Sequence, residues 1–313
     1  MRAVRYHEHG DEDVLQVDDV ALDDPGYGEV RVDIEAAGVN PVDTYGRTGA
    51  YEPPELPMTP GADLAGVVSA VGEGVERFEV GDRVFGTGLG NDRQGTYAEA
   101  ALAPADQLAI LPDGISFVEG AAAALVGVTS WRAIVDYGAL EPAEHCLIHG
   151  GSGGVGHVAV QLAAAMGGRV TATARPEYHD RVRDMGADAV LDYARDDLAE
   201  AVTGVGNPGV ILDHRFDDYA QFDADVAATG ARVAAIGNTT PEAHFDNVPA
   251  ARRKDVGFFF IVMFNTPDYT EILERLAALL VRGDIVPDVA RTYDLSEAAA
   301  AQHDVMADSF FGK

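Results

Sequence analysis

The sequence predicts a two-domain α/β protein, in which a β-rich domain accompanies a domain with a doubly wound parallel sheet. Two observations lead to this fold class. The length of 313 residues exceeds the usual size of a single core, and short β-like runs in the first third give way to alternating helix and strand patterns. Strands that alternate with helices are typical of βαβ units and therefore of a parallel sheet.

Up to about residue 110, short β-like runs are separated by Gly and Pro, which is typical of a compact, mostly antiparallel barrel or sandwich. The runs are VRVDIEAAGV (30–39), AGVVSAVG (65–72), GDRVFGTG (81–88), TYAEAAL (96–102) and QLAILP (107–112). Between the first two lies VNPVDTYGRTGAYEPPELP (39–57). Its prolines, glycines, Asn and Asp indicate a turn-rich connection, and its polar residues leave open whether it is also the wall of a site.

From about Val118 the pattern changes to alternating helices and strands. Helices are expected at 119–137, 155–167, 179–187 and 295–307, a helix followed by a turn at 270–287, and strands at 145–150, 169–174, 189–193, 209–214 and 232–238. We therefore expect a substrate domain at 1–118, a dinucleotide-binding domain at 119–268, and a return to the first domain at 269–313.

The charge of the chain is strongly acidic. It carries 52 acidic and 22 basic residues, a formal net charge of −30, which argues against nucleic acid because phosphates would be repelled. The carboxylates are spread over the whole length, so they predict an acidic surface suited to high salt, where screening suppresses self-repulsion. The N-terminus lacks the apolar segment of a signal peptide, and no apolar run approaches the roughly 18 residues of a membrane span. We expect a soluble, cytoplasmic protein from a salt-loving cell.

Cys146 is the only cysteine of the chain. One thiol makes no intramolecular disulfide, no four-cysteine zinc site and no CxxC redox pair. Since Cys146 lies in a core strand, its simplest role is structural. Any metal site would have to use His and carboxylates.

A glycine-rich loop lies between a predicted strand and a predicted helix, in LIHGGSGGVGHVAVQLAAAMG (147–167). Its GxGxxG spacing suits a dinucleotide: the first glycine makes a tight turn, the second lets the backbone approach a pyrophosphate, and the third lets helix and strand pack closely. The phosphates then lie at the positive end of the helix that begins near Val155. The expected cofactor-binding residues of this loop are Gly151, Gly153, Gly154, Val155 and Gly156.

The end of the next strand predicts which dinucleotide binds. NAD enzymes place Asp or Glu there for the ribose 2′-hydroxyl, whereas an arginine accommodates the 2′-phosphate of NADP. This chain has Ala174 and then Arg175, with no carboxylate at the strand tip. NADPH is therefore favoured, although Arg175 could also be an ordinary surface residue. Tyr193, after the following strand, either flanks the adenosine or packs at the strand end.

The chain resembles the zinc-independent quinone oxidoreductases of the medium-chain dehydrogenase/reductase superfamily, the zeta-crystallin group. The resemblance covers nearly the whole chain and rests on AGVNPVDTY, RTGAYEPPELPMTPGADLAGVVSAVGEGVERFEVGDRVFG, GTYAEAAL, LIHGGSGGVG and the closing Gly-Lys. It implies a Rossmann-type doubly wound parallel sheet plus a GroES-like β-barrel domain, with the active site in the cleft between them. Relatives are commonly dimers, which implies a homodimer, and the apolar FFFIVMF segment is a candidate interface strand.

The resemblance also implies that no metal is bound. Zinc-dependent relatives carry Cys at the position of Asn40 and Gly-His-Glu at Gly61-Ala62-Asp63. Ala62 cannot ligate a metal, and an asparagine is a poor substitute for a thiolate on zinc. Without a Lewis acid, an alcohol dehydrogenase mechanism is disfavoured.

By resemblance, Asn40, Asp43, Tyr45, Arg47 and Tyr51 line the acceptor cleft, with Tyr45 counted among the cofactor-binding residues. Tyr51 could donate a hydrogen bond or proton to the reduced acceptor, and Arg47 could stabilise negative charge that develops on its oxygen. Simpler structural roles compete. Asn40 and Asp43 could only cap turns, and the tyrosines could only pack.

The resemblance also places Thr129 near the nicotinamide, although a helical threonine often bonds back to a carbonyl. Gly237 and Asn238 end a parallel strand, where cofactors bind. Phe264 matches an aromatic residue near the nicotinamide, although its segment also reads as a buried strand. Tyr178 is counted as a cofactor-binding residue, but it stands where some relatives have a lysine, which leaves the 2′-phosphate to Arg175.

Two departures from the family concern the cleft. Asp213-His214-Arg215-Phe216 replaces a Val-Gly pair and puts bulky side chains beside the expected cofactor site. Gly46 stands where relatives have a large apolar residue, and we expect it to widen the acceptor pocket.

Three functions follow from the resemblance. The first is NADPH-dependent reduction of quinones by hydride transfer without metal. The second is reduction of α,β-unsaturated carbonyls or enoyl thioesters, although the acidic surface disfavours a phosphorylated carrier. The third is a non-catalytic NADPH-binding role, as in lens crystallins of this family. The expected partner is a small quinone or enone, with NADPH as cofactor and neither nucleic acid nor membrane.

Overall fold

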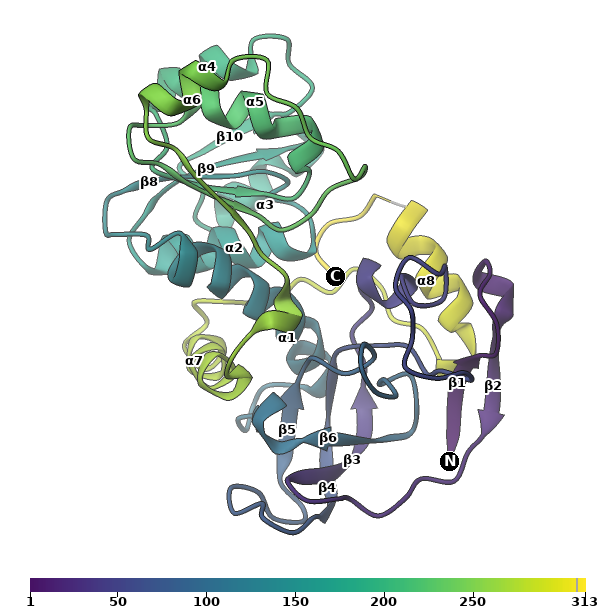
Figure 1. Ribbon diagram of the computed structural model, residues 1–313. Coiled ribbons are helices and arrows are strands. Elements are labelled where there is room, and N and C mark those ends of the chain that lie inside the picture. The colour runs from purple at the N-terminus through teal and green to yellow at the C-terminus, as the bar shows by residue number, and fades with distance from the viewer. Residues whose placement is uncertain (308) are drawn as a thin grey trace.

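The computed structural model describes residues 1–307 and 309–313. Two β-structured bodies lie at opposite ends of the molecule, and helix α1 (Phe117–Trp131) lies between them (Figure 1). As predicted, a β-rich domain is joined to a second domain with a six-stranded parallel sheet and helices.

The β-rich domain contains a five-stranded sheet in which every neighbouring pair is antiparallel. All five predicted runs contribute a strand to this sheet, since their apolar side chains alternate toward a common core. A separate antiparallel pair joins β1 (Arg2–Tyr6) to β2 (Leu15–Asp19). In order across the sheet, the strands are β6 (Ala100–Pro104), β3 (Glu29–Ala36), β4 (Leu64–Val71), β5 (Arg83–Gly86) and β7 (Leu108–Ile110).

The second domain is built on a parallel sheet whose strand order reverses between β8 and β11. Ligands of such sheets bind outside the carboxyl ends of the strands at this reversal. The strands, in spatial order, are β10 (Ala189–Asp192), β9 (Arg169–Ala174), β8 (His145–Ile148), β11 (Val210–Asp213), β12 (Arg232–Ala235) and β13 (Gly257–Phe260). Its helices are α2 (Gly154–Ala165), α3 (His179–Asp184), α4 (Leu198–Val205), α5 (Phe216–Val226) and α6 (Val248–Arg253).

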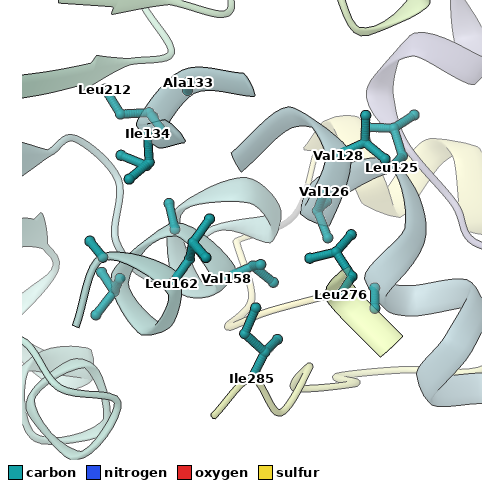
Figure 2. Packing of buried hydrophobic residues seen from close by; sticks show 14 of the residues in the cluster. Leu125, Val126, Val128, Ala133, Ile134, Val158, Leu162, Leu212, Leu276 and Ile285 are labelled. Atoms are coloured by element: carbon teal, nitrogen blue, oxygen red, sulfur yellow. The ribbon is translucent and has the colours of Figure 1, made fainter. Parts of the chain in front are cut away.

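Helix α1 is the centre of a core that both domains share. Ser116 caps its first turn, accepting from the Glu119 N–H at 3.2 Å while the Glu119 carboxylate accepts from the Ser116 N–H at 2.8 Å. Nearly every later residue of the helix is buried, as expected of a helix that is apolar all round. Figure 2 shows its leucine and valines near side chains of α2 and of the segment around Leu276.

The residues after 268 pack mainly on the first domain and on α1. Helix α7 (Tyr269–Arg282) contacts β7 and α1, and α8 (Ala298–Ala307) contacts the short 3-10 helices Glu12–Val14 and Pro41–Thr44. The domain limits near residues 118 and 268 stay a prediction.

One helical segment of the described residues, Phe117–Tyr137, is long and apolar enough to span a membrane. Its most apolar stretch is 78% buried inside the protein. A core helix of a soluble protein passes the same test, so the segment is weak evidence for a membrane span.

Candidate active site

The glycine loop joins β8 to α2, and its glycines have different surroundings. A Cβ on Gly156 would lie 2.0 Å from the Gly150 carbonyl oxygen, and one on Gly151 would lie 2.8 Å from Cβ of Ala172. A Cβ on Gly153 would meet only the Gly150 oxygen, at 3.4 Å. Packing therefore requires the first and third glycines, while the second has an open face where a pyrophosphate could approach the loop backbone.

The loop also presents N–H groups to a ligand. The Gly151 N–H donates to the Thr173 carbonyl oxygen at 2.8 Å, which ties the loop to β9. Helix α2 starts at Gly154, so the N–H groups of Gly154, Val155 and Gly156 have no intrahelical acceptor. Together with the helix dipole, these groups make an anion-binding cradle.

Arg175 and Tyr193 follow the neighbouring strands β9 and β10 and meet at the sheet edge. The Arg175 Nε–H donates to the Tyr193 hydroxyl at 3.1 Å, and the Arg175 side chain is 45% exposed. The Glu177 carboxylate lies 4.0 Å from the guanidinium. The contact with Glu177 is long and the side chain is 45% exposed, so the guanidinium can turn to a phosphate from solvent, and these residues fit a 2′-phosphate.

Tyr178 lies against the C-terminal segment. Its ring is edge-on to Phe311 at 5.4 Å, and Phe311 is buried. The Tyr178 backbone N–H donates to the Arg175 carbonyl oxygen at 3.0 Å, while the Arg175 side chain bonds to Tyr193. The structure therefore groups Arg175 with Tyr193 and places Tyr178 in an aromatic contact.

The ends of β11 and β12 hold the bulky residues that depart from the family. Phe216 is buried among Phe245, Phe258 and Phe260, and Arg215 forms an ion pair with Asp218 at 2.5 Å. The expectation that these two side chains crowd the cofactor cleft is therefore not met. The ring of His214 instead lies against the glycine loop, where a Cβ on Gly150 would be 2.7 Å from it.

Gly237 and Asn238 follow β12, as predicted. The Gly237 carbonyl accepts from the Phe216 N–H at 3.0 Å, and a Cβ on Gly237 would lie 2.7 Å from the His214 oxygen. The Asn238 amide donates to the Thr240 carbonyl at 2.9 Å, and Asn238 is exposed. Gly237 thus permits close packing beside the glycine loop, while Asn238 shapes the following turn.

A small recess, here called the interdomain recess, lies between the first domain and the segment after β13. It encloses about 20 Å³, which is room for one water-sized group. Tyr51, Asp43 and Phe264 meet there. Its lining residues are Tyr6, Val42, Asp43, Gly46, Tyr51, Glu52, Pro53, Leu89, Gly90, Asn91 and Phe264.

Two predicted aromatic residues line this recess from different parts of the chain. Tyr51 is 47% exposed and packs edge-on against Tyr45 with ring centres 5.3 Å apart. Phe264 lies in the 3-10 helix Met263–Asn265, beyond the end of β13, so the interpretation of its segment as one continuous buried strand is wrong. The edge-to-face geometry holds Tyr51 at the rim of the recess.

A buried polar cluster lies behind the recess, made of Asn40, Asp43, Asp63, Tyr97 and Lys313. The Asn40 Nδ2–H donates to Asp63 Oδ2 at 2.8 Å, and the Asn40 backbone N–H and the Tyr97 hydroxyl donate to Asp43 Oδ2 at 2.8 and 2.9 Å. The Lys313 ammonium donates to the Asn40 side-chain oxygen and lies 3.8 Å from Asp63. Asn40 and Asp43 therefore cap the 3-10 helix and also belong to an ionic network.

Burial and like charge control the titration of this cluster. Burial, reinforced by Asp63, raises the pKa of Asp43 to about 7, and burial also raises the pKa of Asp63 although Lys313 opposes it. Burial lowers the pKa of Lys313. Asp43 is thus a carboxyl group at the recess that holds a proton on a large fraction of molecules at neutral pH.

Two predicted site residues lie in different surroundings from those expected. Arg47 is 2% exposed, and its guanidinium donates to the Gln302 side chain at 2.7 Å and to the Gly10 carbonyl at 2.6 Å. It is not among the residues that line the recess, so these contacts indicate a structural role instead of charge stabilisation on an acceptor. The Thr129 hydroxyl donates to the Leu125 carbonyl at 2.8 Å, the helical back-bond that was its simpler expected role.

Sequence reasoning missed Tyr6, Tyr97 and Lys313. The first strand alternates, and this period places Val4 and Tyr6 on the inner face, so a signal for Tyr6 existed. Tyr97 and Lys313 reach the polar cluster only through contacts between distant parts of the chain, which no local pattern encodes.

A GroES-like β-domain beside a parallel sheet with a GxGxxG loop defines a medium-chain dehydrogenase/reductase. Two family models match the chain: "Alcohol dehydrogenase GroES-like domain" over residues 26–113 and "Zinc-binding dehydrogenase" over residues 185–313. The chain belongs to the quinone oxidoreductase family of this superfamily.

Similarity to individual relatives extends over the full chain. The quinone oxidoreductase of Lama guanicoe is 34% identical over 99% of this chain and 94% of its own length, and quinone oxidoreductase 1 of Escherichia coli K12 is 31% identical over 97% and 95%. A solved quinone oxidoreductase of Pseudomonas syringae pv. Tomato DC3000 superposes with a TM-score of 0.90 at 31% identity, covering 100% of this chain and 98% of that one. The Escherichia coli quinone oxidoreductase complexed with NADPH superposes with a TM-score of 0.88 at 29% identity, with the same coverage.

Proposed function

We propose that this protein reduces quinones with NADPH, by hydride transfer and without a metal. The observation that carries the proposal is the interdomain recess, where Tyr51 and Asp43 of the β-domain face Phe264 from the dinucleotide domain. Family membership supports an oxidoreductase, and relatives named as quinone oxidoreductases include one solved with NADPH.

The chain offers a fitting site for NADPH. Gly156 has no room for a side chain, and a side chain at Gly153 would fill the open face of the glycine loop, where the pyrophosphate would lie. The Arg175 guanidinium beside Tyr193 suits the 2′-phosphate. Bound NADPH supplies the hydride, so the protein has to bind, orient and protonate the acceptor.

The donor set does not suit zinc, which supports a metal-free reaction. Ala62 is a buried methyl group, and the Asn40 amide is already engaged by Asp63 and Lys313. Within the described residues, no group of three His, Cys, Asp or Glu side chains could hold a metal ion. Quinones are electron-poor and need little activation, so hydrogen bonds at the acceptor oxygen can replace a Lewis acid.

The acceptor class is tested by following NADPH oxidation in molar salt with benzoquinones, naphthoquinones, enones and crotonyl thioesters. We expect turnover with quinones that exceeds turnover with the other acceptors. Preferential turnover of enones or thioesters would assign the second substrate class, and tight NADPH binding without any turnover would indicate a non-catalytic role.

Replacing Tyr51 by phenylalanine tests the proposed donor at the rim of the recess. The change keeps the aromatic contact with Tyr45 and removes only the hydroxyl. We expect kcat/KM for quinones to fall about tenfold, the usual size of one lost hydrogen bond, while KM for NADPH stays the same. Unchanged turnover of every quinone would exclude Tyr51 as a donor.

Asp43 predicts a pH dependence, because only its protonated form can donate a proton to the reduced acceptor. Its pKa of about 7 implies that kcat falls as the pH rises through 7, measured from steady-state rates between pH 5 and 9. Asp43→Asn should lower kcat and abolish this descending limb. A limb that survives in Asp43→Asn would assign the titration to another group.

The same raised pKa affects stability with a definite sign. The folded protein binds more protons at Asp43 than the unfolded chain between about pH 4 and 7, so the contribution of this group to stability decreases as the pH rises through that window.

We further propose a homodimer formed through the exposed edge strand β13. Phe260 is 72% exposed and Val262 is 48% exposed on this edge, and an unpaired apolar edge favours pairing with a second chain. A monomeric mass by light scattering at assay concentration would contradict this.

The formal charge of −30 supports the proposal of a cytoplasmic protein adapted to high salt. If this proposal holds, the urea concentration at the midpoint of unfolding should rise as the salt concentration rises.

A further inference from the structure

Tyr6 is a buried tyrosine whose hydroxyl has no partner. It ends β1, its side chain is 2% exposed, and its backbone is fixed by reciprocal hydrogen bonds with Met58, both 3.0 Å long. Within residues 1–307 and 309–313, no hydrogen bond satisfies the hydroxyl. The Tyr6 oxygen is not among the fully enclosed polar atoms that lack a partner, and Tyr6 lines the interdomain recess. The hydroxyl is therefore open to a polar group bound in the recess.

The position of this hydroxyl depends on Gly46. A Cβ on Gly46 would lie 2.5 Å from the Tyr6 oxygen, and no atom outside the Tyr6 side chain would lie within 4 Å of it. The φ angle of Gly46 is outside the left-handed region, so its backbone conformation does not require glycine. Glycine is needed at this position only because a side chain would collide with the Tyr6 hydroxyl. The expectation that Gly46 widens the pocket is thus corrected, because a phenol occupies the space.

The hydroxyl can act as a donor in the interdomain recess. Burial raises the pKa of Tyr6 to about 12, against the effect of Arg47, so the phenol keeps its proton at neutral pH. Tyr6 shares the recess with Asp43 and Tyr51. Because the recess has room for one water-sized group, it fits one oxygen atom of an acceptor and not its ring.

We propose that Tyr6 donates a hydrogen bond to the carbonyl oxygen of the acceptor, and that Gly46 allows it to do so. The pair makes the recess selective for acceptors that carry a carbonyl oxygen, as quinones do. This inference rests on the proposed function of the recess. The hydrogen bond strengthens as negative charge develops on the oxygen, so it stabilises the transition state more than the bound acceptor.

The test compares Tyr6→Phe with the wild type, using benzoquinone as the acceptor. We expect kcat/KM for benzoquinone to fall about tenfold, with KM for NADPH unchanged. Tyr27→Phe is the matched control, because it removes a hydroxyl from a tyrosine that is 81% exposed and remote from the recess, and it should keep wild-type rates.

A double-mutant cycle separates catalysis from packing. Gly46→Ala should destabilise the protein, because its methyl group would collide with the Tyr6 hydroxyl. In the Tyr6→Phe background, Gly46→Ala should cost little stability by thermal unfolding, while the low kcat/KM remains.

Two outcomes would overturn the inference: full kcat/KM in Tyr6→Phe, or recovery of kcat/KM in Tyr6→Phe/Gly46→Ala. The second would mean that Tyr6 only fills space. Failure of the proposed function is a different result: the wild-type protein would then not oxidise NADPH with any quinone as the acceptor.

Discussion

Arg175→Ala is expected to weaken NADPH binding by about tenfold to a hundredfold while leaving NADH binding nearly unchanged. The guanidinium follows β9, donates to the Tyr193 hydroxyl and has its remaining face in solvent. A charge-assisted contact to a phosphate contributes about 1.5–3 kcal/mol, which gives that range of affinity. NADH has no 2′-phosphate and so loses nothing. The measurement is Kd for both cofactors by fluorescence titration in molar salt.

A control for Arg175 is Arg183→Ala on α3, which removes a half-exposed arginine that pairs with Asp180. It should shift both dissociation constants equally and slightly, through long-range charge alone. Equal losses of NADPH and NADH affinity in Arg175→Ala would contradict the assignment of Arg175 to the 2′-phosphate.

Gly156→Ala is expected to destabilise the fold strongly. Its Cβ would lie 2.0 Å from the Gly150 backbone oxygen. Gly156 lies in α2 and Gly150 in the loop that directly follows β8, so neither backbone can shift alone. Relieving such an overlap means moving the helix, which costs about 1–3 kcal/mol or more. The free energy of unfolding in urea should decrease accordingly, and NADPH affinity should fall as well.

Gly153→Ala is the matched variant, with one methyl group added three residues earlier. There the nearest atom would lie 3.4 Å away, and the residue has an extended φ of −83°, so stability should change by less than about 1 kcal/mol. NADPH affinity should still fall, because the methyl group occupies the face that a pyrophosphate would approach. If both variants lost the same stability, the separate roles of the two glycines would be wrong.

Local patterns in the sequence were sufficient for the fold class and for the glycine loop. The period-2 runs became β3 to β7, and the GxGxxG spacing lies between β8 and α2, because both signals depend on neighbours in sequence. The same is true of Arg175 and Tyr193, since strand ends in a parallel sheet meet at one edge.

The roles of individual polar residues could not be predicted in the same way. Arg47 was expected at the acceptor, but it is buried by Gln302, which is 255 residues away in sequence. Asn40 is held by Lys313 at a separation of 273 residues. Such contacts depend on how the C-terminal segment packs on the first domain, and this packing leaves no mark in a local motif.

The core around α1 has a consequence for how ligands enter. Because α1 buries apolar side chains against β4 and β5 on one side and against α2 on the other, swinging the two domains apart would expose that surface to water. The segment 48–56 contains the recess-lining residues Tyr51, Glu52 and Pro53 and is mostly exposed. This loop can therefore change shape at the mouth of the recess without exposing the shared core.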